Sequence, residues 1–410
     1  MGLFGSSTDK SDQAKAAERQ RYWMEGNDLM VDMSTPIIEH IDEGEDMIIN
    51  MGPQHPSTHG VLRLELVADG EIVKKCTPHI GYLHRCFEKH AENVPYPEVV
   101  PFVDRLDYMA SMNQDHAYAL AVEKLLKPEL PERVEYIRVI CAELNRIASH
   151  LVALGTFGND AGAFTPFLWC FRDREKILDL FEWLSGARML YNYIWIGGVA
   201  RDLPDGWVEK TTEFLDYFEP KLDNLDKLLS FNKIFIERTA NVGVVDKPNA
   251  IALGLTGPNL RATGYEWDLR KDDPYGIYDR FDFDIPVGTA EFGPLGSCFE
   301  RYYVRVQECR ESVKILRQAM PALPEGNVME AVPKRVKLPK GEAYTRTESP
   351  KGELGFFVVS DGAGQAFRCK GRAPCFCQVS AMDYLCRGVF IADVVMILGS
   401  LDVVLGEIDR

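Results

Sequence analysis

The sequence lacks three features that would each have assigned it to a function class. Its most apolar late stretch, Val389 to Leu405, contains Asp393 and Asp402, and a lipid-facing helix tolerates such charges only at a large cost, so we predict no membrane span. No Gly-x-Gly-x-x-Gly follows a strand pattern and there is no Walker motif, so we expect no bound nucleotide. Basic residues are not in excess, because 46 Lys and Arg stand against 62 Asp and Glu, a net charge of −16. That balance argues against nucleic-acid backbones and anionic membrane surfaces as partners.

Cysteine is too sparse for a disulfide scaffold, with ten residues in 410, and the N-terminal stretch has no apolar core of a secretory signal. We therefore expect reduced thiols in a cytosolic compartment. Cys369, Cys375, Cys377 and Cys386 follow the spacing C-x5-C-x-C-x8-C, unlike zinc knuckles or cluster-binding runs. We favour buried or free thiols over a metal site, and we expect no metal or redox centre held by this chain alone.

What the sequence does contain is an ordinary globular composition, 46% hydrophobic and 26% charged, in a chain long enough for one large or two ordinary domains. Residues 1–45 are polar and lack a core periodicity, which predicts an N-terminal arm. Residues 46–80 predict an antiparallel β unit whose hairpin carries a stiff loop, 52–60. Pro53 and Pro56 exclude a helix interior or a central strand in that loop.

Residues 81–320 follow helical periods and predict a central antiparallel helix bundle. The clearest helix starts at Pro131 and is expected to end near Gly155–Gly158, with an apolar stripe at steps of three and four. Charged residues, among them Arg138, Glu143 and Arg146, lie off this stripe. Further helices are predicted over 165–184, 206–230 with a kink at Pro220, and 297–320, with an irregular stretch at 231–295.

A linker rich in Pro and Lys, 321–342, and a C-terminal β/α extension, 343–410, complete the predicted organisation. The predicted fold class is therefore α+β: a central antiparallel helix bundle with an N-terminal antiparallel β unit and the C-terminal extension.

Four polar groups fall at the edges of these elements. His55 and His59 lie on the 52–60 loop, Tyr108 precedes a helix, and Asp160 is expected on the loop after the long helix. An Asp can orient an imidazole and favour its charged form, and a phenol can donate a hydrogen bond, so such a set can deliver protons. The alternative for each is ordinary: a turn histidine, a tyrosine at a helix start, and a capping aspartate.

Several motifs, in order from about residue 46 to the last residue, carry a family resemblance. They are Gly52-Pro-Gln-His-Pro-Ser-Thr-His-Gly60, Pro78-His-Ile-Gly-Tyr-Leu-His-Arg85 with Glu88-Lys89, Arg105-Leu-Asp-Tyr108, Ala117-Tyr-Ala-Leu-Ala-Val-Glu-Lys-Leu, Leu255-Thr-Gly-Pro-Asn-Leu-Arg261, Gly352-Glu-Leu-Gly355 and Gly406-Glu-Ile-Asp-Arg410. Together they resemble the D-subunit family of the proton-pumping NADH:quinone oxidoreductase, respiratory complex I.

The resemblance implies a quinone head-group pocket shared with a smaller partner that carries a [4Fe-4S] cluster. On matching positions, His59 and Tyr108 hydrogen-bond the quinone carbonyls and Asp160 partners His59. Arg85 matches an arginine placed close to the cluster, and His55 lies in the same loop as His59.

The same resemblance implies partners, substrate and location. The partners are the B subunit with the cluster, the C subunit and the H subunit of the membrane part. The substrate is ubiquinone or menaquinone, and NAD binds elsewhere in the complex. The expected location is peripheral, on the cytoplasmic face of a bacterial inner membrane, because no transit peptide is evident.

The family also resembles the large subunit of [NiFe] hydrogenases, which is the alternative function and the expected fold relative. Hydrogenases bind their metal pair with two Cys-x-x-Cys motifs. The matching positions here are Asp107, Ala110, Val404 and Glu407, so the soft thiolate ligands are absent. A third alternative, a structural subunit with an inactive pocket, is disfavoured because the expected pocket groups are retained.

The chain departs from the common family pattern at three positions. Leu190 replaces a frequent histidine that is thought to link cluster reduction to proton uptake, and leucine cannot titrate. Trp195 stands where an arginine is frequent, and Cys86 replaces a usual glycine beside Arg85.

Overall fold

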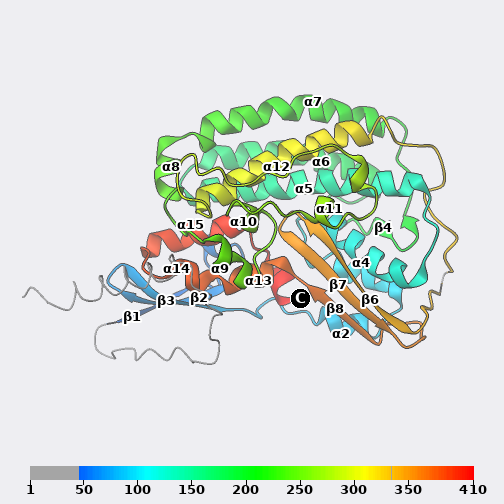
Figure 1. The fold of residues 1–410 in the computed structure, drawn as a ribbon, viewed down its shortest axis with the longest axis horizontal. Helices are drawn as coiled ribbons and strands as arrows, with labels where there is room; N and C mark the ends of the chain where they lie inside the picture. The colour runs from blue at the N-terminus through cyan, green and yellow to red at the C-terminus, as the bar shows by residue number, and fades with distance from the viewer. Residues whose placement is uncertain (1–45, 334) are drawn as a thin grey trace, which may run out of the picture. The chain divides into compact units, whose positions relative to one another are not determined.

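Small antiparallel sheets and a helix bundle make up residues 46–333 and 335–410, which the computed structural model describes (Figure 1). Helices and strands occupy separate stretches of the chain rather than alternating, so the fold is of the predicted α+β class. The expected N-terminal arm, 1–45, lies outside the described residues.

The longest helices run side by side and form the bundle (Figure 1). They are α4 (Ser111–Leu126), α5 (Glu132–Asp160), α6 (Phe164–Ser185), α7 (Trp207–Leu225) and α12 (Cys298–Ala319). Helix α5 lies against α4, α6 and α12, and the short connection 161–163 makes α5 and α6 an antiparallel pair. The helices predicted over 165–184 and 297–320 are thereby confirmed within a residue or two.

Helix α5 is longer than predicted. It continues through Gly155 and Gly158 to Asp160, so Asp160 is a helix residue and not a loop residue. Both glycines are places of close packing: an added Cβ would lie 3.1 Å from Cys170 Cβ at Gly155 and 3.0 Å from Leu229 Cδ2 at Gly158. These glycines do not end the helix; they let neighbouring helices approach it.

The charged residues off the apolar stripe of α5 are also buried. Arg138, Glu143 and Arg146 have no exposed surface, because partners surround α5 on nearly every side. Their charges are met inside the protein; Arg138, for example, donates to both carboxylate oxygens of Glu123 at 2.9 and 2.6 Å. The periodicity therefore predicted the helix but not the burial of its polar side.

The N-terminal sheet has the order β1-β2-β3, from β1 (Met47–Met51), β2 (Arg63–Asp69) and β3 (Ile72–His79). Met51 pairs with Leu64 and Met47 with Ala68, so the segment between β1 and β2 is the expected loop. Gly52 is required there, since its φ is +94° and a Cβ would lie 2.0 Å from the Leu62 carbonyl oxygen.

The C-terminal sheet has the order β6-β7-β8, from β6 (Gly341–Ser349), β7 (Gly352–Ser360) and β8 (Arg368–Arg372). It packs on α4, and Tyr118 of α4 meets Phe356 of β7 edge to face, with ring centroids 5.7 Å apart. The short turn between β6 and β7 reaches the bundle, where Lys351 is fully buried.

The remaining elements are short. They are α2 (Phe87–Ala91), α3 (Tyr96–Val103), the strand pair β4 (Ile194–Trp195) and β5 (Gly198–Val199), α8 (Lys233–Thr239), α9 (Lys247–Ala252), α10 (Pro258–Arg261), α11 (Leu269–Asp272), η3 (Tyr278–Arg280), α13 (Pro374–Ser380), α14 (Met382–Cys386), α15 (Ile391–Leu401) and α16 (Leu405–Asp409). The helix expected over 206–230 continues through Pro220 as α7 and ends in a π-helical turn, η2 (Asp226–Ser230). None of the helices in the described residues combines the length and the apolar character needed to cross a bilayer.

Candidate functional site

The loop between β1 and β2 is fixed by short-range hydrogen bonds and ends at His59. Its 3-10 turn, η1 (Pro56–Thr58), follows His55, whose Nδ1 accepts a hydrogen bond from Ser57 N at 3.2 Å. The buried Thr58 hydroxyl lies 2.9 Å from the His55 carbonyl oxygen. His59 closes the turn in the left-handed region, with φ 54° and ψ 32°. Residues other than glycine adopt this conformation at a cost, and such residues cluster at functional sites.

The imidazole of His59 meets the last residue of α5. His59 Nε2 lies 2.7 Å from Asp160 Oδ2, and the two side chains are only 15% and 7% exposed. The carboxylate accepts from a protonated Nε2 and orients the ring, so Nδ1 is the ring nitrogen left to donate to a bound molecule. Gly399 of α15 makes room for this contact, since an added Cβ would lie 2.6 Å from Asp160 Oδ2.

Tyr108 lies in the connection between α3 and α4 and is half-buried. Gly406 of α16 packs against it, since a Cβ there would lie 3.2 Å from Tyr108 Cε1. Burial and the Asp107 carboxylate raise the pKa of Tyr108, whereas Lys351 and Arg85 lower it. The net result is a raised pKa, so the phenol keeps its proton at neutral pH and can donate a hydrogen bond.

His59, Tyr108 and Asp160 line one cavity of about 300 Å³. Its other walls are apolar or uncharged except at Asp402: Pro56, Met109, Val152, Thr156, Asn159, Phe167, Asp402, Val403 and Val404. A few converging polar groups in a largely apolar wall are typical of small-molecule sites. The fold therefore brings together three groups that are far apart in the sequence.

Asp402 is the charged pocket residue that sequence reasoning missed. It follows α15 in the left-handed region, with φ 57°, and its carboxylate side chain is 11% exposed. The signal was present, because an acid inside the apolar stretch 389–405 is costly unless it serves a purpose. Asp402, whose charge argues against a membrane span, therefore also lines the pocket.

His55 and Arg85 are not among the residues that line the cavity. The His55 side chain is exposed and caps η1. Arg85 Nη2 donates to the Arg105 carbonyl at 2.6 Å. It nevertheless lies near Tyr108, since a Cβ on Gly406 would be 3.0 Å from Arg85 Nη2 and 3.2 Å from the tyrosine ring.

The three departures from the family pattern lie outside the cavity lining. Cys86 has φ 56° and Leu190 has φ 59°, a region that glycine enters without steric cost. The backbone at position 86 is therefore one that suits the glycine expected there from the resemblance. Trp195 is 42% exposed, and its indole Nε1 donates to the Asn192 carbonyl at 2.8 Å.

No group of three or more His, Cys, Asp or Glu side chains within 46–333 and 335–410 is arranged to hold a metal ion. The ten cysteines are free thiols. Of the four that raised the question of a metal site, Cys369, Cys375 and Cys386 are buried and Cys377 is partly buried.

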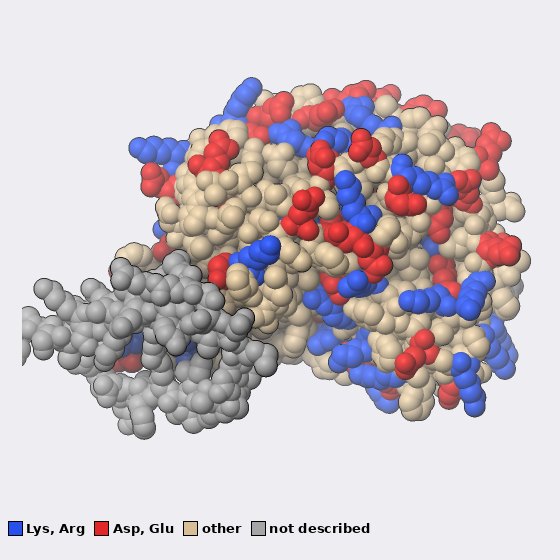
Figure 2. Space-filling model, viewed as in Figure 1, with Lys and Arg blue, Asp and Glu red and all other residues tan. Residues whose placement is uncertain are grey.

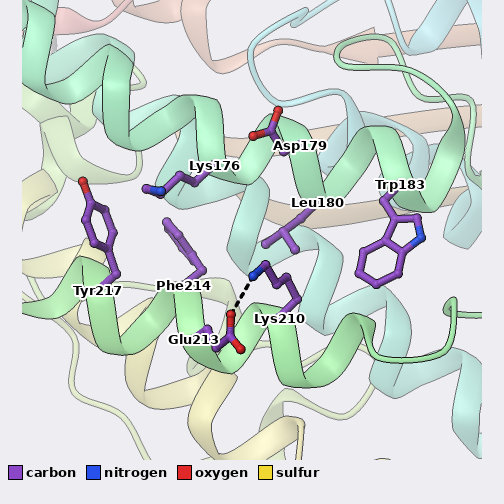
Figure 3. Close-up of a pocket in the computed structure, with 8 residues that line it drawn as sticks. All are labelled: Lys176, Asp179, Leu180, Trp183, Lys210, Glu213, Phe214 and Tyr217. Carbon is purple, nitrogen blue, oxygen red and sulfur yellow. Dashed lines mark hydrogen bonds and ion pairs between the residues drawn. The ribbon is translucent and has the colours of Figure 1, made fainter.

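A larger hollow, about 430 Å³, lies between α6 and α7 (Figure 3). Its walls combine apolar surfaces, including Leu180 and Phe214, with charged groups such as Lys210, which pairs with Glu213 at 2.7 Å. These charges already have partners or face solvent, and no set of donors converges as in the smaller cavity. We therefore take the cavity at His59 as the candidate site.

On the face shown in Figure 2, the charged residues do not form a nucleic-acid-binding surface that would compete with the cavity at His59 as the functional site. Acidic and basic side chains are interspersed there, in contrast to the one-signed stripe that a nucleic-acid binder presents.

Comparison with known proteins gives a consistent result over most of the chain. The sequence profile described as "Respiratory-chain NADH dehydrogenase, 49 Kd subunit" matches residues 160–337 and 330–410. The D subunit of NADH-quinone oxidoreductase from Chlorobium luteolum is 55% identical over 378 residues, 91% of this chain and 96% of the relative. A D subunit of the enzyme from Cytophaga hutchinsonii is 56% identical over 383 residues, 91% and 97%. The D subunit from Chlorobaculum tepidum is 54% identical over 377 residues, 91% and 94%.

Proposed function

This chain belongs to the 49 kDa subunit family of the respiratory-chain NADH dehydrogenase, the D subunits of NADH-quinone oxidoreductase, and we propose that its cavity at His59 binds the head group of the quinone. The observation that carries the proposal is the convergence of the His59–Asp160 pair and Tyr108 on one cavity.

The chemistry of quinone reduction requires such an arrangement. A quinone that takes two electrons develops negative charge on two oxygens and takes up two protons. Fixed donors at each oxygen stabilise that charge in a site from which water is largely excluded. The imidazole of His59, oriented by Asp160, serves one carbonyl, and the phenol of Tyr108 serves the other.

The electron donor to this pocket belongs to the same proposal. We propose that a [4Fe-4S] cluster on the partner B subunit supplies the electrons. Arg85 lies beside Tyr108 and outside the cavity lining, and we propose that it faces the cluster. The neighbouring C and H subunits complete the site, at the cytoplasmic face of a bacterial inner membrane. The quinone is ubiquinone or menaquinone.

We also propose that the fold is related to the large subunit of [NiFe] hydrogenases. The positions that match the hydrogenase metal cysteines are Asp107, Ala110, Val404 and Glu407. Of these, Val404 lines the cavity, and Asp107 precedes Tyr108 in the chain. The quinone pocket would thus stand where hydrogenases hold their metal pair, with the soft ligands replaced.

The proposal is tested by replacing the phenol that the cavity presents. In Tyr108→Phe the ring still fills its place beside Gly406, but the donor is lost. We expect NADH:quinone reductase activity of membranes carrying the complex to fall by about 100-fold or more. NADH:ferricyanide activity, which reports the electron path into the complex, should persist.

The matched control is Tyr344→Phe, which removes a phenol on β6 that is 41% exposed and does not line the cavity. We expect both activities to stay at the level of the unaltered complex. If Tyr108→Phe also leaves both activities unchanged, the assignment of Tyr108 as a quinone ligand fails.

A further inference from the structure

One buried cation stands behind the cavity and has no part in the function proposed above. Lys351 lies in the turn between β6 and β7 and has no exposed surface. Its Nζ donates to Ser149 Oγ of α5 at 2.8 Å and lies 3.3 Å from Asp107 Oδ2 and 3.6 Å from Asp402 Oδ2. A lysine is rarely buried unless its charge is paired.

The turn that carries Lys351 is locked in place. Gln378 Nε2 donates to the Lys351 carbonyl at 2.6 Å, and Ser349 Oγ donates to the Gly352 carbonyl at 2.9 Å. The backbone of Gly352 lies so close to Gly257 that a Cβ on Gly257 would be 2.4 Å from Gly352 Cα. The ammonium group is therefore held at one point rather than moving among partners.

Of the two carboxylates that face Lys351, one lines the cavity and the other is next to a lining residue. Asp107 precedes Tyr108 in the chain, and Asp402 lines the cavity. Among residues 46–333 and 335–410, neither Asp107 Oδ2 nor Asp402 Oδ2 has a hydrogen-bond partner; besides Lys351, the cation paired with Asp402 there is Arg305, with Nε at 3.7 Å. Lys351 is thus the one cation that faces both carboxylates among the ion pairs of the described residues.

We propose that Lys351 is a positioning residue for quinone reduction: by neutralising Asp107 beside Tyr108, it lets the tyrosine give up its proton while negative charge forms in the cavity. The proposal rests on the function assigned above. Lys351 itself does not line the cavity and acts through Asp107 and Asp402.

The electrostatic balance around these groups agrees with that role. Burial alone would lower the pKa of Lys351, but Asp107 and Asp402 outweigh it and the pKa is raised, so the ammonium persists. Burial raises the pKa of Asp107, while Lys351 opposes the increase. Without Lys351, the pKa of Asp107 would be higher still. Once ionised, the Asp107 carboxylate would repel the negative charge that forms at Tyr108.

Other titratable groups also face Lys351. They are Cys375 of α13 and Glu407 of α16, both of which act to raise the pKa of Lys351. Arg85 acts on Tyr108 as well and lowers its pKa. Burial and Asp107 raise the pKa of Glu407 to about 7 while Lys351 lowers it, so every variant is compared in a Glu407→Gln background, which removes that titration.

The experiment measures quinone reductase activity between pH 6 and 8.5 in membranes that carry the whole complex, relative to ferricyanide activity at each pH. In Lys351→Met we expect a loss of less than about threefold at pH 6 and of about tenfold or more at pH 8.5, because Asp107 ionises unopposed as the pH rises. Asp107→Asn, which keeps the cation and removes the carboxylate that it neutralises, should show no added loss at pH 8.5 relative to pH 6. Lys351→Met/Asp107→Asn should recover most of the activity that Lys351→Met loses at pH 8.5.

A purely structural role for Lys351 predicts an equal loss at every pH, and that result would overturn the proposal. So would a double variant no better than Lys351→Met. If Lys351→Met does not assemble, Lys351→Met/Asp107→Asn is compared with Asp107→Asn. A loss in the double variant of about tenfold or more at pH 8.5 but not at pH 6 would overturn the proposal, because no Asp107 charge is then left to neutralise. Lys210→Met, in the hollow between α6 and α7, is the lysine control and should match the unaltered complex.

The two proposals fail in different ways. If Tyr108→Phe is fully active, the pocket assignment fails and Lys351 has no proton donor to act upon. If Tyr108→Phe is inactive while Lys351→Met keeps the pH profile of the unaltered complex, only the role of Lys351 is wrong.

Discussion

At the scale of single residues, Gly399 packs tightly against the Asp160 carboxylate. A Cβ at position 399 would come within 2.6 Å of Asp160 Oδ2 and 3.0 Å of Phe157 Cδ2. Gly399 lies inside α15, where alanine is otherwise the better helix former. Glycine at position 399 therefore leaves the space that the Asp160 carboxylate needs to orient His59.

Gly399→Ala should displace the Asp160 carboxylate and weaken its contact with His59. We expect quinone reductase activity to fall by about tenfold or more, since small misplacements of catalytic groups are costly, while ferricyanide activity remains. Gly364→Ala is the matched control, because no atom lies closer than 4.0 Å to its added Cβ. Equal activity of the two variants would show that the contact with Asp160 is not needed.

Sequence reasoning could name His59, Tyr108 and Asp160 as candidates, but it placed Asp160 on a loop, whereas Asp160 is the last residue of α5. Their meeting could not be deduced from the residues, since it depends on how α5, α15 and the loop at 52–60 pack. Lys351 was missed for a related reason. It lies in a turn between two strands, where an exposed lysine is the ordinary expectation, and only tertiary packing buries it.

At the scale of elements, α4 and α5 are joined by a buried ion pair. Arg138 of α5 binds both carboxylate oxygens of Glu123 of α4 and also donates to the Trp195 carbonyl at 2.9 Å. Glu123 in turn accepts a hydrogen bond from Gly197 N at 2.7 Å. The pair thus ties two helices to the β4–β5 hairpin.

Arg138→Met should destabilise the chain by about 3–5 kcal/mol, because it leaves the Glu123 carboxylate buried without its cation. The double variant Arg138→Met/Glu123→Gln should recover more than half of that loss, since no charge then remains unpaired. Urea unfolding of the full-length chain measures both.

The surface variant Arg317→Met is the control for this pair. Its partners Asp216 and Glu219 are more than half exposed, so we expect a change below about 1 kcal/mol. A loss in Arg138→Met no larger than in this control would contradict the importance of the buried pair.

The elements also show which patterns carry information. Leu62, Leu64 and Leu66 alternate in the sequence and are all fully buried in or beside β2, so period two predicted this strand and its inner face. The apolar stripe on α5 predicted a helix. Such a stripe does not show whether the polar face of the helix is exposed to solvent or is buried against other charged residues. The end of α5 was misjudged because a glycine can serve packing as well as termination.

At the scale of the whole molecule, buried carboxyl groups make stability depend on pH. Burial and then the Asp107 charge raise the pKa of Glu407 to about 7. Its neighbours are Gln114 Nε2 at 2.8 Å and Cys375 N at 3.2 Å. A carboxyl whose folded pKa is raised binds its proton more tightly in the folded chain, so its contribution is complete below about pH 4.5 and is lost as the pH rises through about 7.

Glu407→Gln keeps a neutral side chain at every pH and should remove this contribution. We expect the free energy of unfolding of the unaltered chain, minus that of the variant, to decrease between pH 5 and pH 8 by on the order of 1–3 kcal/mol. The difference between the two chains cancels other titrating groups. A constant difference over that range would show that Glu407 has an ordinary pKa in the folded chain.

The distance along the chain between His59 and Asp402 also has a consequence for biosynthesis. At about 5–20 residues per second, a ribosome needs on the order of half a minute to pass from one to the other. Until then the loop at 52–60 has no α15 to contact, and Tyr108 has no Gly406 beneath its ring. The pocket is therefore completed only when the last segment of the chain has emerged, and a nascent chain stalled before that point carries no partly working version of it.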